Sequence, residues 1–173
     1  MSGAADPVAG AAADAAAAGT LAELGDALVR RLAGHIGFDR FNIGLIDPVR
    51  HVFHDAYVHG RNVEGRSTGH RRTLDGTVVE AAMRAGGAFQ FGAADRNAWV
   101  TRFPRFGPVY DSGIRSMLAV PMGSEGRTKA SLVFASRDPD AYTPETVALA
   151  AAIGAAVALS FAGFDGMPAS PPR

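Results

Sequence analysis

The sequence predicts a single α+β domain built around a mostly antiparallel sheet. The chain has 173 residues, of which 47% are hydrophobic, so it can bury one core without covalent cross-links. Short segments of alternating polarity, typical of strands, are joined by tight turns. Helical patterns stand near both ends and once in the middle. Hairpin-linked strands with helices segregated from them are typical of this fold class.

The first helical pattern begins at Thr20, which forms a capping box with Glu23. Apolar residues then recur at helical spacing, at Leu21, Leu24, Leu28, Leu32 and Ile36. Residues 1–19 are rich in Ala and Gly. We predict that they form a flexible segment or a weak helix begun by Asp6 and Pro7.

An antiparallel hairpin follows, with strands over residues 40–46 and 52–59 and a turn at Asp47-Pro48. In the second strand, strict alternation places four residues on one face. They are Phe53, Asp55, Tyr57 and His59.

The middle of the chain is less regular. Residues 60–72 are polar and basic and are predicted to form a loop, after which Asp75 caps a short helix through Arg84. Residues 88–91 form a short strand. Residues 92–111 contain four aromatic residues and two prolines without a clear period. Irregular segments of that length are usually functional.

The last third predicts strands over residues 116–120 and 130–135. A final helix is capped by Thr143, with Pro and Glu in its first turn, and runs to about Phe161. We therefore divide the chain into the segment 1–19, one domain over residues 20–163, and a Pro-rich tail or truncated linker over residues 164–173.

Composition excludes several classes of function. The chain has 17 Lys plus Arg and 17 Asp plus Glu, and this balance argues against nucleic acid as the main partner. It has no cysteine, which excludes disulfides, thiolate metal sites, cysteine nucleophiles and cofactors attached through a thioether. Residues 1–20 lack the features of a signal peptide, so we expect a cytoplasmic protein.

Residues 147–164 carry no charge and are long enough to raise the question of a membrane span. The segment is mostly Ala, and neither a basic cluster nor an aromatic belt flanks it. We predict a buried helix and no membrane partner.

Three segments together resemble the GAF domain family. They are residues 113–122 (Gly-Ile-Arg-Ser-Met-Leu-Ala-Val-Pro-Met), 131–136 (Ser-Leu-Val-Phe-Ala-Ser) and 141–149 (Ala-Tyr-Thr-Pro-Glu-Thr-Val-Ala-Leu). Their order and spacing match the family over roughly residues 20–162, although Ser131 stands where the family usually has Gly.

This resemblance implies a GAF/PAS-like fold. The sheet would have five or six strands, with the N- and C-terminal helices on one face. The ligand pocket would lie on the other face, under loops and short helices. The sixth strand would lie in one of the loop regions. PAS-type and autoinducer-binding domains are an alternative at the level of the fold.

The functional reading also comes from the resemblance. It implies a regulatory sensor that binds a small molecule and signals through its terminal helices to an output domain or partner, in transcription regulation or with a histidine kinase. We expect a homodimer through these helices, no enzymatic activity, and no output domain within this chain. The alternative is a ligandless module for dimerisation or protein interaction.

The cofactors of known family members narrow the ligand. The Asn-Lys…Phe…Asp-Glu signature of cyclic-nucleotide-binding members is absent. Covalent bilin binding and free methionine sulfoxide reduction need cysteines that this chain lacks. Haem stays among the open ligands because the chain has five histidines. We predict no metal site, because His59 and Asp55 share a strand face but two ligands are too few.

The candidate ligand-binding residues are mostly aromatic. They either line an apolar cavity or simply fill the second face of the sheet. The aromatic set is Phe89, Phe91, Trp99, Phe103, Phe106 and Tyr110. Tyr57, His59 and Ser116 are candidates for polar contacts to a ligand, and the alternative for each is an ordinary role on the surface of the sheet. Arg115 is a candidate for binding a carboxylate or phosphate, or for tying a loop to the sheet.

One basic cluster, Arg61, Arg66, His70, Arg71 and Arg72, lies in the predicted loop. It either attracts an anionic ligand or belongs to a solvated mobile loop. Asp95 and Asp111 receive no catalytic role, because nothing in the sequence determines their separation.

Overall fold

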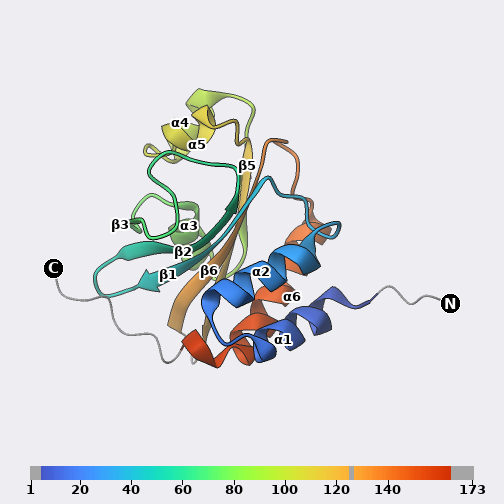
Figure 1. Cartoon of the computed structure of the whole chain (residues 1–173). Coiled ribbons are helices and arrows are strands. Elements are labelled where there is room, and N and C mark those ends of the chain that lie inside the picture. The colour runs from blue at the N-terminus through green and yellow to red at the C-terminus, as the bar shows by residue number, and fades with distance from the viewer. Residues whose placement is uncertain (1–4, 125–126, 165–173) are drawn as a thin grey trace.

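The computed structural model describes residues 5–124 and 127–164. Over these residues the chain forms a six-stranded antiparallel sheet in the order β3-β2-β1-β6-β5-β4 (Figure 1). The strands are β1 (Arg40–Asp47), β2 (Val52–Gly60), β3 (Arg71–Thr73), β4 (Phe89–Gly92), β5 (Ser116–Ser124) and β6 (Arg127–Ser136). The predicted α+β class is confirmed, and β3, beginning within the predicted 60–72 loop, is the sixth strand.

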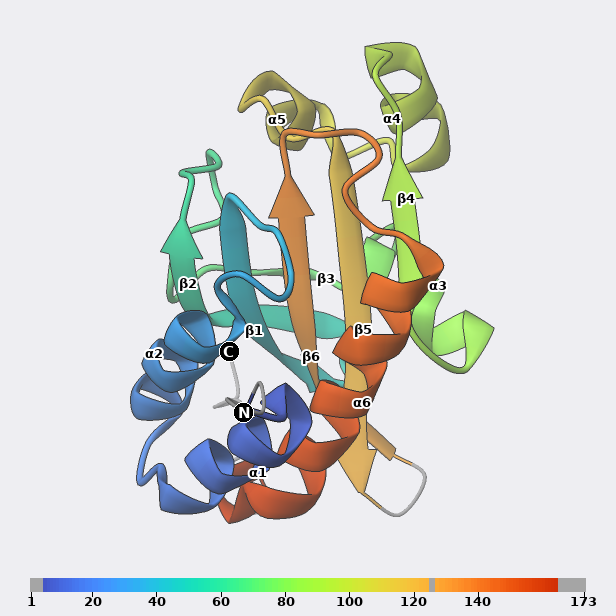
Figure 2. The same cartoon turned by 90° about the vertical axis from the view of Figure 1, so that its right-hand side faces the viewer.

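Three helices cover one face of the sheet (Figure 2). They are α1 (Pro7–Ala17), α2 (Leu21–Leu32) and α6 (Pro144–Ser160), which is followed by the short 3-10 helix η1 (Ala162–Phe164). The core between these helices and the sheet contains Leu24, Leu28, Phe41, Leu132, Phe134 and Ile153, all fully buried. None of the described helices combines the length and apolar character that a membrane span requires.

Helix α1 differs from the flexible segment predicted for residues 1–19. Asp6 caps it, since its Oδ1 accepts a hydrogen bond from the amide of Val8 at 3.0 Å. Ala11 is buried, and Asp14 pairs with Arg31 of α2 at 2.5 Å. The flexible description is therefore wrong for residues 7–17, and the helix begun by Asp6 and Pro7 is present. The predicted tail over residues 164–173 lies, except for Phe164, outside the described residues.

The other face carries the short helices α3 (Val78–Ala85), α4 (Arg96–Arg102) and α5 (Gly107–Asp111). Figure 1 shows α4 and α5 together beyond one end of the sheet. Thr77, rather than the predicted Asp75, caps α3, because its Oγ1 accepts from the amide of Glu80 at 3.1 Å. Because α4 and α5 lie within it, the 92–111 segment, predicted to be irregular, is largely helical.

A β-bulge in β2 changes which side chains face the two layers. Ile43 of β1 pairs with Tyr57, whereas the next residue, Gly44, pairs with Asp55, so Ala56 is an extra residue. Alternation is interrupted there, and side chains on either side of a bulge exchange faces. Phe53 and Asp55 lie on the face of the short helices, but Tyr57 packs in the core beneath α2. The prediction that these residues share one face is wrong.

Candidate functional site

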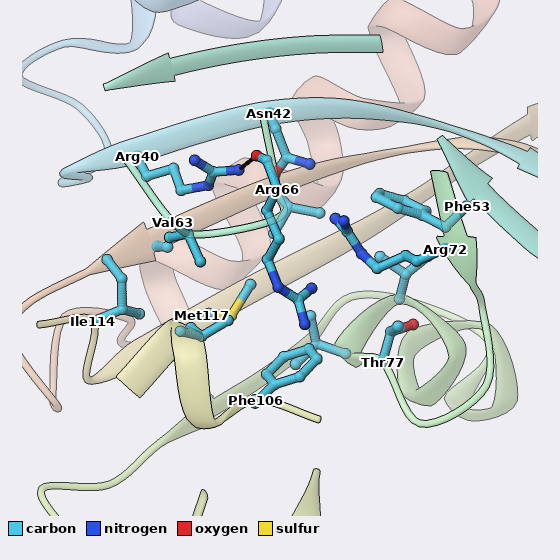
Figure 3. Close-up of a pocket in the computed structure, with 15 residues that line it drawn as sticks. Arg40, Asn42, Phe53, Val63, Arg66, Arg72, Thr77, Phe106, Ile114 and Met117 are labelled. Atoms are coloured by element: carbon cyan, nitrogen blue, oxygen red, sulfur yellow. Dashed lines mark hydrogen bonds between the residues drawn. The ribbon is translucent and has the colours of Figure 1, made fainter. Parts of the chain in front are cut away.

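A small cavity lies on the sheet face opposite α1, α2 and α6 (Figure 3). Its volume is about 30 Å³, which is room for about two water molecules. Apolar residues of the sheet, α3 and α5 form much of its wall. The polar residues that line it are Arg40, Asn42, Arg66, Arg72 and Thr77. The cavity is therefore small, and five of the residues that line it carry polar side chains.

Asp55 is the buried anion of the site. Its side chain is 0% exposed and accepts hydrogen bonds from Arg72 Nη2 at 2.8 Å (Oδ1) and 2.7 Å (Oδ2). Asn42 Nδ2 donates to Oδ1 at 3.0 Å. Pairing of β2 with both β1 and β3 brings the three residues together. A buried carboxylate needs such partners, because water no longer solvates its charge.

Residues 61–70, here called the strap, connect β2 to β3 and pass beside the cavity. Arg40 of β1 is 5% exposed and holds the strap, donating to the carbonyls of Arg61 (2.9 Å) and Arg66. Val63 of the strap is buried among the cavity residues. The Arg66 guanidinium carbon lies 4.6 Å from the centroid of the Phe106 ring, and its Nη2 donates to the carbonyl of Arg105 at 3.2 Å. Arg66 thus links the strap to the segment around α5.

The site holds an excess of positive charge. Three guanidinium groups, of Arg40, Arg66 and Arg72, stand against the single carboxylate of Asp55, a formal balance of +2. Burial, and after it the charge of Arg72, lowers the pKa of Arg66 to about 10. Burial also lowers the pKa of Arg40. Both groups stay charged at neutral pH, so the repulsion is a cost that the native fold carries.

Arg72 is the least satisfied of the three arginines. Its Nη2 is engaged by Asp55, but its buried Nε and Nη1 have no acceptor among the described residues. A buried donor without a partner costs about 1–3 kcal/mol, and more when it is charged. Arg72 therefore presents unused donors in the wall of the cavity.

The six predicted aromatic residues do come together, but mostly as a packed plug. Trp99, Phe103 and Phe106 are fully buried, and the Phe103 and Phe106 ring centroids lie 5.1 Å apart. Phe91 meets Trp99 edge-on at 4.9 Å, and the Trp99 Nε1 donates to the carbonyl of Ala93. Of the six, Phe106 alone lines the cavity. For the other five, filling the second face describes the packing better than lining a pocket.

The other four predicted residues do not line the cavity either. Tyr57 lies on the helix side of the sheet, where its hydroxyl donates to Asp26 Oδ1 at 2.7 Å. His59 is exposed. The hydroxyl of Ser116 donates to the carbonyl of Asp138 at 2.6 Å. The bulge explains the position of Tyr57. In β5, Met117 and Ala119 face the short helices and Leu118 and Val120 face the long ones, which puts Ser116 out of phase with the cavity.

Arg115 ties a loop to the sheet, the structural alternative considered for it. Its Nη1 donates to the carbonyls of Tyr110 (2.8 Å) and Ile114 (2.9 Å). Its guanidinium carbon also lies 3.6 Å from the centroid of the Tyr110 ring. Arg115 therefore anchors α5 and is not among the residues that line the cavity.

Sequence reasoning missed Arg40, Asn42 and the role of Asp55. In the sequence, Arg40 and Asn42 simply alternate with apolar residues, as they would in a strand with one face in water. The predicted basic cluster divides: Arg66 and Arg72 line the cavity, whereas Arg61, His70 and Arg71 are exposed. The burial of Arg40 and Asn42, which marks them as candidates, is visible only in the fold.

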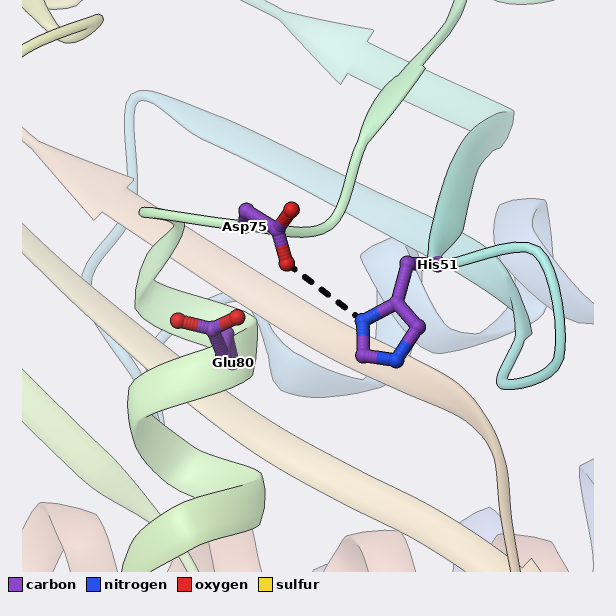
Figure 4. Close-up of side chains that lie close together, drawn as sticks. All are labelled: His51, Asp75 and Glu80. Atoms are coloured by element: carbon purple, nitrogen blue, oxygen red, sulfur yellow. Dashed lines mark ion pairs between the residues drawn. The ribbon is translucent and has the colours of Figure 1, made fainter.

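A second group of titratable side chains connects the β1–β2 turn to α3 (Figure 4). His51 Nδ1 lies 3.3 Å from Asp75 Oδ1, and one potential ligand atom from each of His51, Asp75 and Glu80 lies within 4.8 Å of the others. Glu80 also pairs with Arg84 at 3.4 Å and accepts from the amide of Gly76 at 3.4 Å. These side chains already form ion pairs and hydrogen bonds with each other and with neighbouring residues, so we assign the group a structural role.

Comparison with solved structures supports the fold. The GAF domain of an Acinetobacter phosphoenolpyruvate-protein phosphotransferase superposes with a TM-score of 0.73 at 17% identity, covering 96% of each chain. The free methionine-R-sulfoxide reductase of Neisseria meningitidis, in complex with its substrate, has a TM-score of 0.67 at 18% identity, covering 90% of this chain and 86% of that one. A GAF domain of a two-component sensor histidine kinase from Bacillus halodurans has a TM-score of 0.62 at 12% identity, covering 79% and 90%.

Among curated proteins, no sequence matches. The family model described as "GAF domain" matches residues 20–161, most of the chain. The six-stranded antiparallel sheet with helices on both faces agrees with this match. The chain therefore belongs to the GAF domain family.

Proposed function

We propose that this chain is a regulatory sensor domain that binds a small molecule in the cavity beside the strap. The observation that carries the proposal is a cavity lined by Arg72, whose buried Nε and Nη1 have no hydrogen-bond partner among the described residues. The helix layer on the opposite face of the sheet would pass the bound state to an output domain or partner. The GAF family and the neighbours from kinases and phosphotransferases support a regulatory context.

Adjacent residues of the strands connect the cavity on one face of the sheet to the helices on the other face. In β1, Asn42 lines the cavity while its neighbours Phe41 and Ile43 pack beneath the helices. In β5, Met117 and Leu118 divide in the same way. A ligand that binds one arrangement of the strap better than another shifts the population between them. The strands would carry that shift to α2 and α6.

Binding without turnover is the better-supported form of this function. Some structural neighbours are methionine sulfoxide reductases, which are enzymes. Family members with that activity use cysteines, and this chain has none. We therefore propose a non-enzymatic role. The cytoplasmic location and the absence of nucleic-acid partners stay predictions from the sequence.

A second proposal is that two copies of the chain pair through the helix layer. The outer side of α6 carries an apolar stripe of Ala148, Ala152, Ala155 and Leu159, and Leu159 is 89% exposed. A groove of about 640 Å³ runs beside it, lined in part by Met83, Val120 and Met122. Replacement of Leu159 by Glu should shift a dimer toward monomer in light scattering without loss of folding. An unchanged mass would place any dimer contact elsewhere.

Native mass spectrometry of the freshly purified protein tests the sensor proposal directly. We expect a discrete additional mass per chain, released on denaturation, or a mass gained when a ligand is added. A bare chain that gains no mass from any compound, under conditions shown to keep weak complexes intact, would contradict ligand sensing. A dimer that stays bare would favour the ligandless interaction module.

A further inference from the structure

We propose that the cavity is an anion site, and that Arg72 and Arg66 hold a small oxyanion or short carboxylate in it. The inference rests on the proposed function, because it names the class of ligand for the same cavity. Figure 3 shows the guanidinium groups of Arg40, Arg66 and Arg72 reaching the cavity from three elements: β1, the strap and β3.

Charge favours an anion over the other ligand classes. Three guanidinium groups and one carboxylate leave a formal +2 beside the cavity, where a low local dielectric strengthens repulsion. A cation would increase that repulsion. A neutral apolar ligand would leave the repulsion in place and the Arg72 donors unsatisfied. A bound anion removes both costs.

Hydrogen bonding identifies Arg72 as the main contact. Asp55 occupies only its Nη2, and the buried Nε and Nη1 are left for another acceptor. Arg40, in contrast, already donates to two strap carbonyls. Among the described residues, the Arg66 guanidinium donates to the carbonyl of Arg105 and stacks on Phe106. Arg72 and Arg66 therefore have donors to spare, whereas Arg40 fixes the strap and adds charge.

Helix α3 contributes a second, independent attraction. Its N-cap Thr77 and first residues Val78 and Val79 line the cavity, so the positive end of the helix dipole borders the same space. The Thr77 hydroxyl is already used, donating to the carbonyl of Leu74 at 2.8 Å and accepting from Glu80. Helix α3 thus contributes the electrostatic field of its dipole rather than a side-chain hydrogen-bond donor.

The volume favours a small ligand. A space of about 30 Å³ suits an ion of a few heavy atoms better than a nucleotide or haem. Small oxyanions and short carboxylates share the required chemistry, namely negatively charged oxygen acceptors that can bind a guanidinium group.

Titration calorimetry with sodium nitrate, phosphate, sulfate, acetate and propionate tests the proposal. Ionic strength is kept constant with gluconate, which is too large for the cavity. We expect at least one of the five anions to bind the wild-type chain in a saturable way. Binding of only the carboxylates, or of only the inorganic ions, would show which of these two classes of anion the cavity accepts.

Matched variants locate the site. Arg66→Gln leaves the Asp55–Arg72 pair intact and should weaken binding by about tenfold or more, the effect of one charge-assisted hydrogen bond. Arg72→Met combined with Asp55→Asn should abolish binding while avoiding an unpaired buried charge. Arg71→Met is the control, because Arg71 lies in the same strand but is exposed. Equal weakening by Arg71→Met would overturn the proposed site.

Two negative outcomes separate this inference from the proposed function. If none of the anions binds but native mass spectrometry finds a neutral molecule whose binding Ala135→Leu abolishes, the anion assignment fails and the sensor proposal survives. If neither anion nor any other molecule binds, both fail.

Discussion

The two faces of the sheet bury their residues by different means. Beneath α1, α2 and α6 the core is almost wholly apolar, and the Tyr57–Asp26 hydrogen bond lies at its edge. Beside the cavity the sheet instead buries Asp55 at 0% exposure and Arg40 and Asn42 at 5% each. The first face gains stability from packing, whereas the second carries the cost of burying charge.

Unsatisfied groups show the same contrast. On the helix side the hydroxyl of Tyr142 is buried without a hydrogen-bond partner among the described residues, and it is neutral. On the cavity side the two unpartnered atoms belong to the cation of Arg72. A charged group with buried donors that lack an acceptor costs more free energy than a neutral one. We therefore interpret the helix face as the main source of stability, and the cavity face is where we propose the ligand site.

The largest expected effect comes from breaking the apolar face. Phe134 is fully buried, with its ring centroid 5.2 Å from that of Phe41. Phe134→Ala should lower the free energy of unfolding by about 4 kcal/mol, through lost burial and a new cavity. Urea denaturation measures this, with the exposed Val49→Ala as control. A loss below about 1 kcal/mol would contradict the role given to this face.

Next in size is the buried ion pair. Asp55→Asn should lower the free energy of unfolding by about 3 kcal/mol, because the charge of Arg72 is then buried without its partner. The double variant Asp55→Asn, Arg72→Met should recover part of that loss. Urea denaturation of the two single variants and the double variant completes the cycle. Additive losses would show that the two side chains do not stabilise each other.

A smaller effect on stability, with a large effect on binding, is expected from filling the cavity. Ala135 follows Phe134 in β6 but lines the cavity. Ala135→Leu should cost about 1–2 kcal/mol through overpacking and should exclude the ligand. Urea denaturation measures the effect on stability, and native mass spectrometry measures the effect on ligand binding. A ligand that still binds Ala135→Leu with unchanged affinity would occupy some other place.

The smallest effect concerns pH and involves the half-buried His54 of β2. Burial, with a further contribution from Arg71, lowers the pKa of His54 in the folded chain. The unfolded chain then binds more protons below about pH 6.5, so stability falls as pH decreases through that value. The His54 contribution should be well under about 1 kcal/mol because the side chain is half-buried. His54→Gln should remove it from the pH dependence of the melting temperature. An identical pH profile for the variant would refute the assignment.

Local sequence signals predicted most of the elements. Capping by Thr20 and Thr143, hairpin turns and strand alternation identified two of the three long helices and five of the six strands. Errors arose where one local signal had two readings. Both Asp75 and Thr77 can cap a helix, and the choice of Thr77 depends on the turn that precedes α3. Strand β3 is only three residues long, and its pairing with β2 rather than its own composition makes it a strand.

The candidate site was harder to predict. The aromatic residues were correctly grouped, yet their rings mostly contact one another. Arg66 and Arg72 were recognised as part of a basic cluster and placed in a loop. A sequence does not show whether an arginine side chain in a loop points into the protein or into solvent. Their direction depends on Asp55 and Phe106, which lie 17 and 40 residues away in the chain.

Periodicities, caps and turns can be predicted from the chain alone, because they depend on neighbours within a few residues. The absence of cysteine chemistry is likewise visible there. The face that each side chain occupies depends on the folded sheet, since one extra residue at Ala56 reverses the alternation of β2. The tertiary structure also determines that three arginines meet around one aspartate, because strand register and long-range pairing, rather than local propensity, bring those charges together.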